Sequence, residues 1–497
     1  MAESEQEIGD RGDNDNLKTD KLFILKKWNA VAMWSWDVEC DTCAICRVQV
    51  MDFEWAVRMN RSSLRIIGLW FEEDHAGTMK FLRKLRNMGI VLIILFVCVL
   101  PCLYSLIKQC DSLMAVIDNL SYTIPLTITL MKYIVILSKK EVLLPLVNMI
   151  AEDWAKLKTD FERDVMIQRT RITRATSILS YALIFTAVMF MIVLPRTGIT
   201  TRYVTNETNI KKLFPVPTYY IYDISETPYF EIMFLLQMAT LVLMALCYIG
   251  VDNFFGILIL HICGQLENLR TRLANIKHLE TFDRILVTTV EDHVRLIRAV
   301  DVIESIFTML VLALLFYFGT FACIYGLLLM TILTQEEQFS VLRITYLACI
   351  FLNTFLQTSL YCITGQILVN QSEEVYVAAY ECEWLNLKSN KAKSLILIMA
   401  RAQRPLCLTA GKLFPMTMLT FCNVTQLYIL PVDEVIVKYD CLKKKANADG
   451  IPCSPDLKNN YMYMTEAAPN LVLHDSCILH YNQLICIDMW HMMRPNK

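Results

Sequence analysis

The chain has 497 residues, of which 55% are hydrophobic and 19% charged, and its formal net charge is −2. This length would suffice for two or three soluble domains, but so apolar a composition with only 14 glycines and 14 prolines is unlike theirs. The near-zero charge argues against nucleic acid as a partner, because nucleic-acid-binding proteins usually carry a clustered basic face. Several almost uncharged stretches reach the roughly 20 residues that cross a bilayer as a helix, so the sequence predicts an all-α integral membrane protein in a lipid bilayer.

Residues 1–50 form a polar extension, which we predict to be disordered or an artefact of the gene model. The first twenty residues are acidic and polar, and they lack the basic and apolar regions of a cleavable secretory signal. Cys40, Cys43 and Cys46 have a C-x2-C-x2-C spacing found in some iron–sulfur sites, but the fourth cysteine of that motif is missing. We therefore predict neither a metal site nor any other cofactor. The character of the sequence changes at Met51.

Seven apolar runs predict seven transmembrane helices. They cover residues 88–107, 113–137, 176–194, 229–250, 306–333, 341–369 and 409–430. Lys132 lies near the inner end of the second run, where we expect its side chain to snorkel to the membrane interface. Lysine and arginine are concentrated on the side of the N-terminus, so we predict that the N-terminus is cytosolic.

The loops on the predicted cytosolic side are long and have a helical pattern. Between the second and third runs, apolar residues recur every three or four positions from Leu143 to Val165, with charged residues between them. The same spacing occurs in residues 266–276 and 286–297, which we expect to form an antiparallel pair. We predict that the membrane helices continue into the cytosol as amphipathic extensions, whose apolar stripes serve intramolecular packing or contacts between subunits.

A spaced series of single residues marks the region before and within the seventh run. Its members are Gly365, Ser372, Tyr380, Cys382, Trp384, Arg401, Pro405, Thr409, Gly411 and Phe421. This series resembles the closing region of insect odorant receptors. Residues 247–270 and 293–307 are similar to the family's segments that leave the fourth helix and approach the fifth. The start at Met51 also looks like the start of many odorant receptors, so we hypothesise that Met51 is the initiator and that residues 51–430 are the receptor domain.

The resemblance implies an odorant receptor subunit in the plasma membrane of olfactory sensory neuron dendrites. Members of this family bind small volatile or apolar ligands and, as hetero-tetramers with a co-receptor subunit, form ligand-gated cation channels. The alternatives are a gustatory-type receptor channel, a G-protein-coupled receptor or a transporter with seven helices. We do not expect an enzyme, because the common nucleotide-binding, zinc-protease and hydrolase motifs are absent from the sequence.

The family implies an odorant pocket in the outer half of the helices and a pore lined by the seventh helix. A pocket for an apolar ligand should be lined mainly by aromatic, methionine and branched aliphatic side chains. The candidates in the outer half are Tyr122, Phe185, Met189, Phe190, Phe234, Met238 and Tyr346. The candidates in the seventh helix and pore are Thr409, Gly411, Phe414 and Phe421.

Two further predictions concern the outer side. Of the N-x-[ST] sequons in the sequence, only the one at Asn206 falls in a long outer loop, so we predict glycosylation there. Residues 431–497 depart from the family pattern, because Pro431, Asp433 and Glu434 stand where the family continues an apolar helix. We interpret this segment as an atypical C-terminal tail, such as translated intron or mis-spliced sequence.

Overall fold

The computed structural model describes ten segments of the chain. They are residues 51–71, 77–108, 113–156, 159–196, 213–222, 224, 226–275, 279–334, 341–382 and 389–426. The predicted N-terminal extension, the glycosylation site at Asn206 and the predicted tail 431–497 lie outside these segments.

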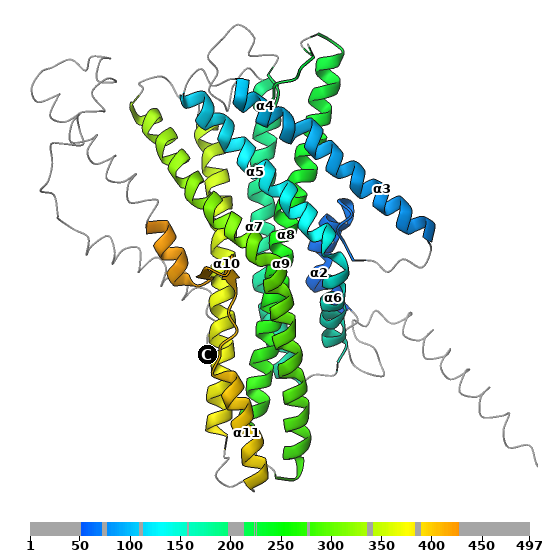
Figure 1. Ribbon diagram of the computed structural model, residues 1–497, viewed down its shortest axis with the longest axis vertical. Coiled ribbons are helices and arrows are strands. Elements are labelled where there is room, and N and C mark those ends of the chain that lie inside the picture. Colours follow the sequence, from blue (N-terminus) through cyan, green and yellow to red (C-terminus); the bar gives the residue numbers. More distant parts are fainter. Residues whose placement is uncertain are drawn as a thin grey trace, which may run out of the picture.

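The described residues form a bundle of long helices that run along the long axis of the molecule (Figure 1). The elements are α2 (Met51–Ile66), α3 (Gly77–Ile93), the π-helix η1 (Ile94–Val99), α4 (Leu100–Lys108), α5 (Leu113–Ser138), α6 (Lys140–Ala155), α7 (Asp160–Arg196), α8 (Tyr229–Ala274), α9 (Leu279–Thr334), α10 (Val341–Glu381), α11 (Ser389–Ala402), β1 (Thr409–Ala410) and β2 (Phe414–Pro415). The predicted all-α membrane class is confirmed, with one short hairpin as its only sheet among the described residues.

Six of these helical stretches are long and apolar enough to cross a membrane. They are Thr78–Lys108, Ala115–Ser138, Asp160–Arg196, Tyr229–Ala274, Arg284–Ala322 and Ile344–Glu381. The first six predicted spans lie within the corresponding helices. Several helices are much longer than the roughly 20 residues that a bilayer needs, so their remaining turns extend beyond it.

The first spanning stretch contains a π-helical turn that ends two residues before a proline. Pro101 has no backbone N–H, so the carbonyl of Val97 loses its usual partner four residues on. The Tyr220 hydroxyl donates to this carbonyl at 2.8 Å, and the backbone N–H of Tyr219 donates to the carbonyl of Pro101 at 3.1 Å. The segment before α8 is thereby attached to the first spanning stretch.

Helix α8 lies at the centre of the bundle. It contacts α2, α5, α7, α9 and α10. From Cys247 to Leu266 almost every side chain is buried, whichever face of the helix it lies on. A helix that is apolar on all sides is expected in such a central position, and α8 therefore sets the positions of its neighbours.

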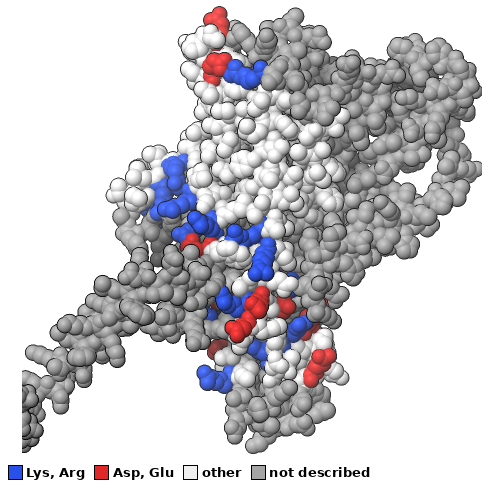
Figure 2. Space-filling view, turned by 180° about the vertical axis from the view of Figure 1, so that it is seen from behind, with Lys and Arg blue, Asp and Glu red and all other residues white. Residues whose placement is uncertain are grey.

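The lower part of the bundle is held together by ion pairs between helix extensions. Arg169 of α7 pairs with Glu267 of α8 at 2.7 Å, and Arg272 of α8 pairs with Glu162 of α7 at 2.5 Å. The space-filling view shows an almost uncharged belt, with charged side chains at its upper end and throughout the part below it (Figure 2). This distribution matches helices that cross a membrane and continue on one side of it as amphipathic extensions.

The predicted start of the seventh span is wrong in its local structure. Thr409 and Gly411 do not begin a helix, because β1 pairs with β2 as an antiparallel hairpin with Thr409 opposite Pro415. Helical residues begin only at 418 and continue to 426, where the described part ends. Pro415 lacks the N–H that a helix interior requires, which helps to keep the helix from starting earlier.

Candidate functional site

The residues predicted to line an odorant pocket differ in burial. Tyr122, Phe234 and Tyr346 are buried, Phe185, Phe190 and Met238 are partly buried, and Met189 is exposed. With 55% of its surface exposed, Met189 faces away from the bundle interior, so it does not line an internal pocket of this subunit.

Two of these aromatic residues belong to separate clusters. Phe185 stacks on Tyr181 with ring centroids 6.3 Å apart. Phe234 packs against Phe230 at 6.2 Å, and the guanidinium of Arg196 lies 4.0 Å from its ring centroid. Aromatic type and approximate depth thus do not determine which side chains share one cavity.

Sequence reasoning missed a charged group inside the bundle. The Nζ of Lys132 lies 2.7 and 2.8 Å from the two carboxylate oxygens of Asp252, and the Tyr361 hydroxyl donates to Oδ1 of Asp252 at 2.7 Å. The same Nζ is 3.9 Å from the ring centroid of Tyr248. We call Lys132, Asp252 and Tyr361 the charged core.

The predicted snorkelling of Lys132 is therefore wrong. Its side chain is only 1% exposed, and that of Asp252 is fully buried. A buried ammonium is tolerated only with a counter-charge and further hydrogen-bonding groups, and the charged core supplies both. Because its members come from α5, α8 and α10, the charged core fixes three spanning helices relative to one another at one depth.

The hairpin before the last described helix is clamped between α9 and α10. The Thr409 hydroxyl donates to Glu304 at 2.6 Å, and the backbone N–H of Gly411 donates to the carbonyl of Thr308 at 2.9 Å. On the other side, the backbone N–H of Leu406 donates to the Ser372 hydroxyl at 3.0 Å. We call residues 406–416 the clasp.

Gly365 of α10 permits the closest contact of the clasp. A Cβ at this position would lie 2.1 Å from the carbonyl oxygen of Met416, so a side chain has no room there. Three residues of the spaced series in the sequence thus meet here: Thr409 lies in the clasp, and Gly365 and Ser372 of α10 contact it. It determines where the helix that begins at residue 418 leaves the bundle.

Phe421 joins this last helix to the bundle. It is buried, with ring centroids 5.2 Å from Phe355 of α10 and 6.1 Å from Phe318 of α9. By contrast, Phe414 is half exposed on β2. Of the four residues predicted for the seventh helix, only Phe421 is helical in the structure.

Helix α10 also carries two buried side-chain amides whose hydrogen bonding is incomplete among the described residues. Asn353 and Gln357 are 2% and 0% exposed, and they are one helical turn apart. Within the described part of the chain, Oδ1 of Asn353 and both amide atoms of Gln357 have no hydrogen-bond partner. Such groups are costly inside a membrane protein unless water or a ligand satisfies them.

Below the belt, a second buried charged group surrounds His261. Its Nε2 lies 3.2 Å from Asp153, which also receives a hydrogen bond of 2.7 Å from Arg295. Burial raises the pKa of Asp153, but hydrogen bonding and charge from His261 and Arg295 outweigh this and hold the pKa below its ordinary value. His261 lies on α8 and packs against Trp154 of α6, with ring centroids 6.5 Å apart.

Comparison with known proteins shows the family to which this chain belongs. Residues 112–429 match the family model described as the 7tm odorant receptor. Odorant receptor 30a of Drosophila melanogaster is 28% identical over 196 residues, which cover 39% of this chain and 50% of that protein. The chain thus spans about half the length of the curated relatives it matches.

A solved structure shares the fold over almost its whole length. The insect olfactory receptor OR5 from Machilis hrabei, in complex with eugenol, aligns with a TM-score of 0.64 at 17% identity, covering 77% of this chain and 98% of that one. A separate similarity is to RING-box protein 2 of Homo sapiens, at 60% identity over 57 residues, or 12% of this chain and 50% of that protein.

Proposed function

Because the chain belongs to the odorant receptor family, we propose that it is a subunit of a cation channel opened by small apolar organic compounds. This is a family of receptors and not of enzymes. The structurally similar olfactory receptor was solved in complex with eugenol, which supports a small organic ligand for this chain.

The observation that carries this proposal is the pair of unpartnered amides on α10. A pocket for a small ligand is mostly apolar, with a few polar groups that fix its orientation. Asn353 and Gln357 are buried and lie on the outer side of Tyr361 along α10; among the described residues, Oδ1 of Asn353 and both amide atoms of Gln357 have no hydrogen-bond partner. They are suited to bind the hydroxyl or carbonyl of an odorant, and the buried Tyr122 and Tyr346 are the candidates for the apolar wall.

Helix α10 then connects ligand binding to the pore. Gln357 precedes Tyr361 of the charged core by one turn, and Phe355 contacts Phe421 of the last described helix. A ligand that changes the position of α10 near Gln357 therefore acts on the contact with that helix. One turn below Gln357, the charged core holds α10 in place, so this part of the helix stays fixed when the outer part moves.

The proposal includes the assembly and the cellular site. The channel is a hetero-tetramer with an odorant co-receptor in the plasma membrane of olfactory neuron dendrites. The N-terminus lies in the cytosol, and Asn206 is glycosylated on the outer side. Basic side chains are frequent in the part below the uncharged belt (Figure 2), and the long helix extensions contribute Arg163, Arg272 and Arg295 to it, which supports this orientation.

Ligand-evoked current tests the role of Gln357. Cells that express the chain with a co-receptor are screened against odorants that carry a hydroxyl or carbonyl and against hydrocarbons of the same size. In Gln357→Leu, the half-maximal concentration for polar odorants should rise about tenfold, which corresponds to one hydrogen bond of roughly 1.4 kcal/mol. Hydrocarbon responses should not change.

The control is Leu352→Ala, which shortens an exposed side chain of the same helix. Equal sensitivity of wild type and Gln357→Leu to polar odorants would refute the role of this amide. Absence of current from surface-expressed wild type across the whole panel would contradict the channel proposal itself.

The similarity to RING-box protein 2 calls for a separate proposal. RING domains bind zinc through cysteine and histidine, and Cys40, Cys43 and Cys46 include the C-x2-C spacing of zinc ligands. We infer that the similar stretch includes Cys40, Cys43 and Cys46, and that the chain joins a segment of RING-box type to the receptor near Met51. Transcript reads and N-terminal peptides that continue across Met51 would establish a joined protein, whereas reads that always start there would show two separate genes.

A further inference from the structure

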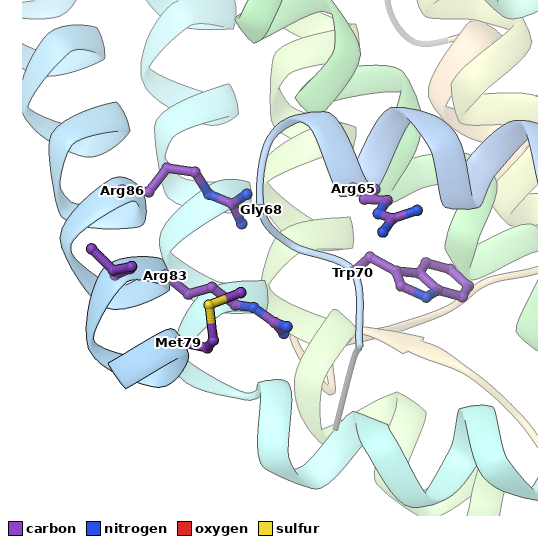
Figure 3. Close-up of a pocket in the computed structure, with 7 residues that line it drawn as sticks. Arg65, Gly68, Trp70, Met79, Arg83 and Arg86 are labelled. Atoms are coloured by element: carbon purple, nitrogen blue, oxygen red, sulfur yellow. The ribbon is translucent and has the colours of Figure 1, made fainter. Parts of the chain in front are cut away.

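A basic cavity lies between the end of α2 and the first turns of α3. Its volume is about 300 Å³. The lining residues are Arg65, Gly68, Trp70, Met79, Leu82, Arg83 and Arg86. Figure 3 shows the side chains of Arg83 and Arg86 extending from α3 toward the turn after α2, where Gly68 and Trp70 lie. This cavity is unrelated to the amides on α10 and to the clasp.

The turn after α2 gives the cavity a fixed wall. Gly68 has φ +76°, and a Cβ there would lie 2.5 Å from a guanidinium nitrogen of Arg86. Its carbonyl accepts a hydrogen bond of 3.4 Å from the Asn87 side chain. Trp70 is buried, and its backbone N–H donates to the carbonyl of Leu64 at 3.1 Å. The cavity is therefore bounded by folded backbone and a packed indole.

The chemistry of the lining fits a phosphate group. Three of the seven described residues that line it are arginines, and none of these seven is acidic. A guanidinium presents paired N–H donors that match the oxygens of phosphate. Lys80 and Lys84 on the same helix add positive charge outside the cavity.

The position of the cavity fits a lipid as the source of that phosphate. Above Arg86, α3, η1 and α4 have no charged residue until Lys108. Apolar side chains of the same helix are exposed on its surface, and they include Phe81, Leu85, Met88, Leu92 and Phe96. The arginines thus lie where the helix enters the uncharged belt, so a lipid headgroup can reach them while its acyl chains lie along α3.

We propose that this cavity binds the phosphate-bearing headgroup of an anionic lipid of the inner leaflet. The site is connected to the charged core. The carbonyl of Ile67, next to Gly68, accepts a hydrogen bond of 2.9 Å from the Tyr133 hydroxyl, and Tyr133 is adjacent to Lys132. Lipid bound here stabilises the contact between α2, α3 and α5.

Lipid binding to the purified full chain tests the proposal. Native mass spectrometry measures how many molecules of phosphatidylinositol 4,5-bisphosphate and of phosphatidylcholine bind to the chain, with inorganic phosphate as the competitor. We expect Arg83→Gln/Arg86→Gln to lower affinity for the anionic lipid at least tenfold. Lys80→Gln/Lys84→Gln removes the same charge from the same helix outside the cavity, and it should change affinity less than threefold. Arg83→Lys/Arg86→Lys keeps the charge but loses the paired N–H donors, so its affinity for the anionic lipid should lie between those of the wild type and the arginine-to-glutamine variant.

Three results would overturn the proposal. Equal losses in the arginine-to-glutamine and lysine-to-glutamine variants would mean diffuse surface attraction. Inorganic phosphate that binds more tightly than the lipid would make a free anion the ligand. Lipid that binds only when Glu72, Glu73 and Asp74 are neutralised would mean that the chain's own carboxylates fill the cavity.

Discussion

The charged core makes a quantitative prediction about the stability of the bundle. Asp252→Asn leaves the ammonium of Lys132 buried without its counter-charge. Both side chains are essentially unexposed and their atoms are 2.7 Å apart, so solvent does not replace the lost partner. Removing one member of a buried ion pair typically costs about 3–5 kcal/mol. We expect a loss of that size in the free energy of unfolding and little folded receptor at the cell surface.

A double-mutant cycle separates the interaction energy between Lys132 and Asp252 from the effect of each single substitution. Lys132→Met/Asp252→Asn removes both charges, so it should recover at least about 2 kcal/mol relative to the sum of the single variants. The measurement is unfolding of the purified chain in lipid nanodiscs, followed by tryptophan fluorescence. Tyr361→Phe is a graded control, because it removes only one hydrogen bond to the carboxylate and should cost about 1.5–3 kcal/mol.

Two results would refute this reasoning. If Asp252→Asn costs less than about 1 kcal/mol, water reaches the site and the pair is not buried as described. If the two single effects simply add, Lys132 and Asp252 do not interact energetically despite their short distance.

Two predictions concern the clasp. Gly365→Ala should abolish ligand-evoked current and lower the free energy of unfolding by roughly 1–3 kcal/mol or more, because the new methyl overlaps the carbonyl of Met416. The matched control in the same current and unfolding assays is Gly89→Ala, because a Cβ at Gly89 meets nothing within 4 Å. Thr409→Val keeps the shape of the side chain but removes its hydrogen bond to Glu304. The free energy of unfolding should therefore fall by about 1.5–3 kcal/mol, and the current should be reduced at unchanged surface expression. If the variant has the current and stability of the wild type, this hydrogen bond does not hold the hairpin in place.

Hydropathy was sufficient to predict the six long helices, because length and the absence of charge are properties of a continuous stretch. Partners across the bundle were not predictable in the same way. Lys132 and Asp252 are 120 residues apart, and each is an isolated charge in an apolar run. The signal in the sequence that could have indicated an ion pair was the opposite sign of the charges of Lys132 and Asp252. Proximity to a predicted helix end led instead to the expectation that Lys132 reaches the interface.

The clasp shows a different limit of pattern reasoning. The run from 409 is apolar enough to be counted as a span, but it contains Gly411 and Pro415 within a few residues of each other. Both residue types disfavour a helix interior, and here they form the hairpin. The resemblance indicated that Thr409 and Gly411 matter, whereas their role in clamping the hairpin to Glu304 and Thr308 required the structure.

Helix α10 carries the features on which the proposed gating depends. Along its length it carries the unpartnered amide of Gln357, the contact of Phe355 with the last described helix, the hydroxyl of Tyr361 in the charged core and the close approach at Gly365. Ser372 then holds the far end of the clasp. A ligand can shift the equilibrium between two states only if it binds them with different affinity. Because the charged core and the clasp fix α10 from Tyr361 onward, the part free to respond is the outer part that holds the amides. Ligand binding at Gln357 is therefore expected to move Phe355 against Phe421 while the lower half of the bundle stays in place.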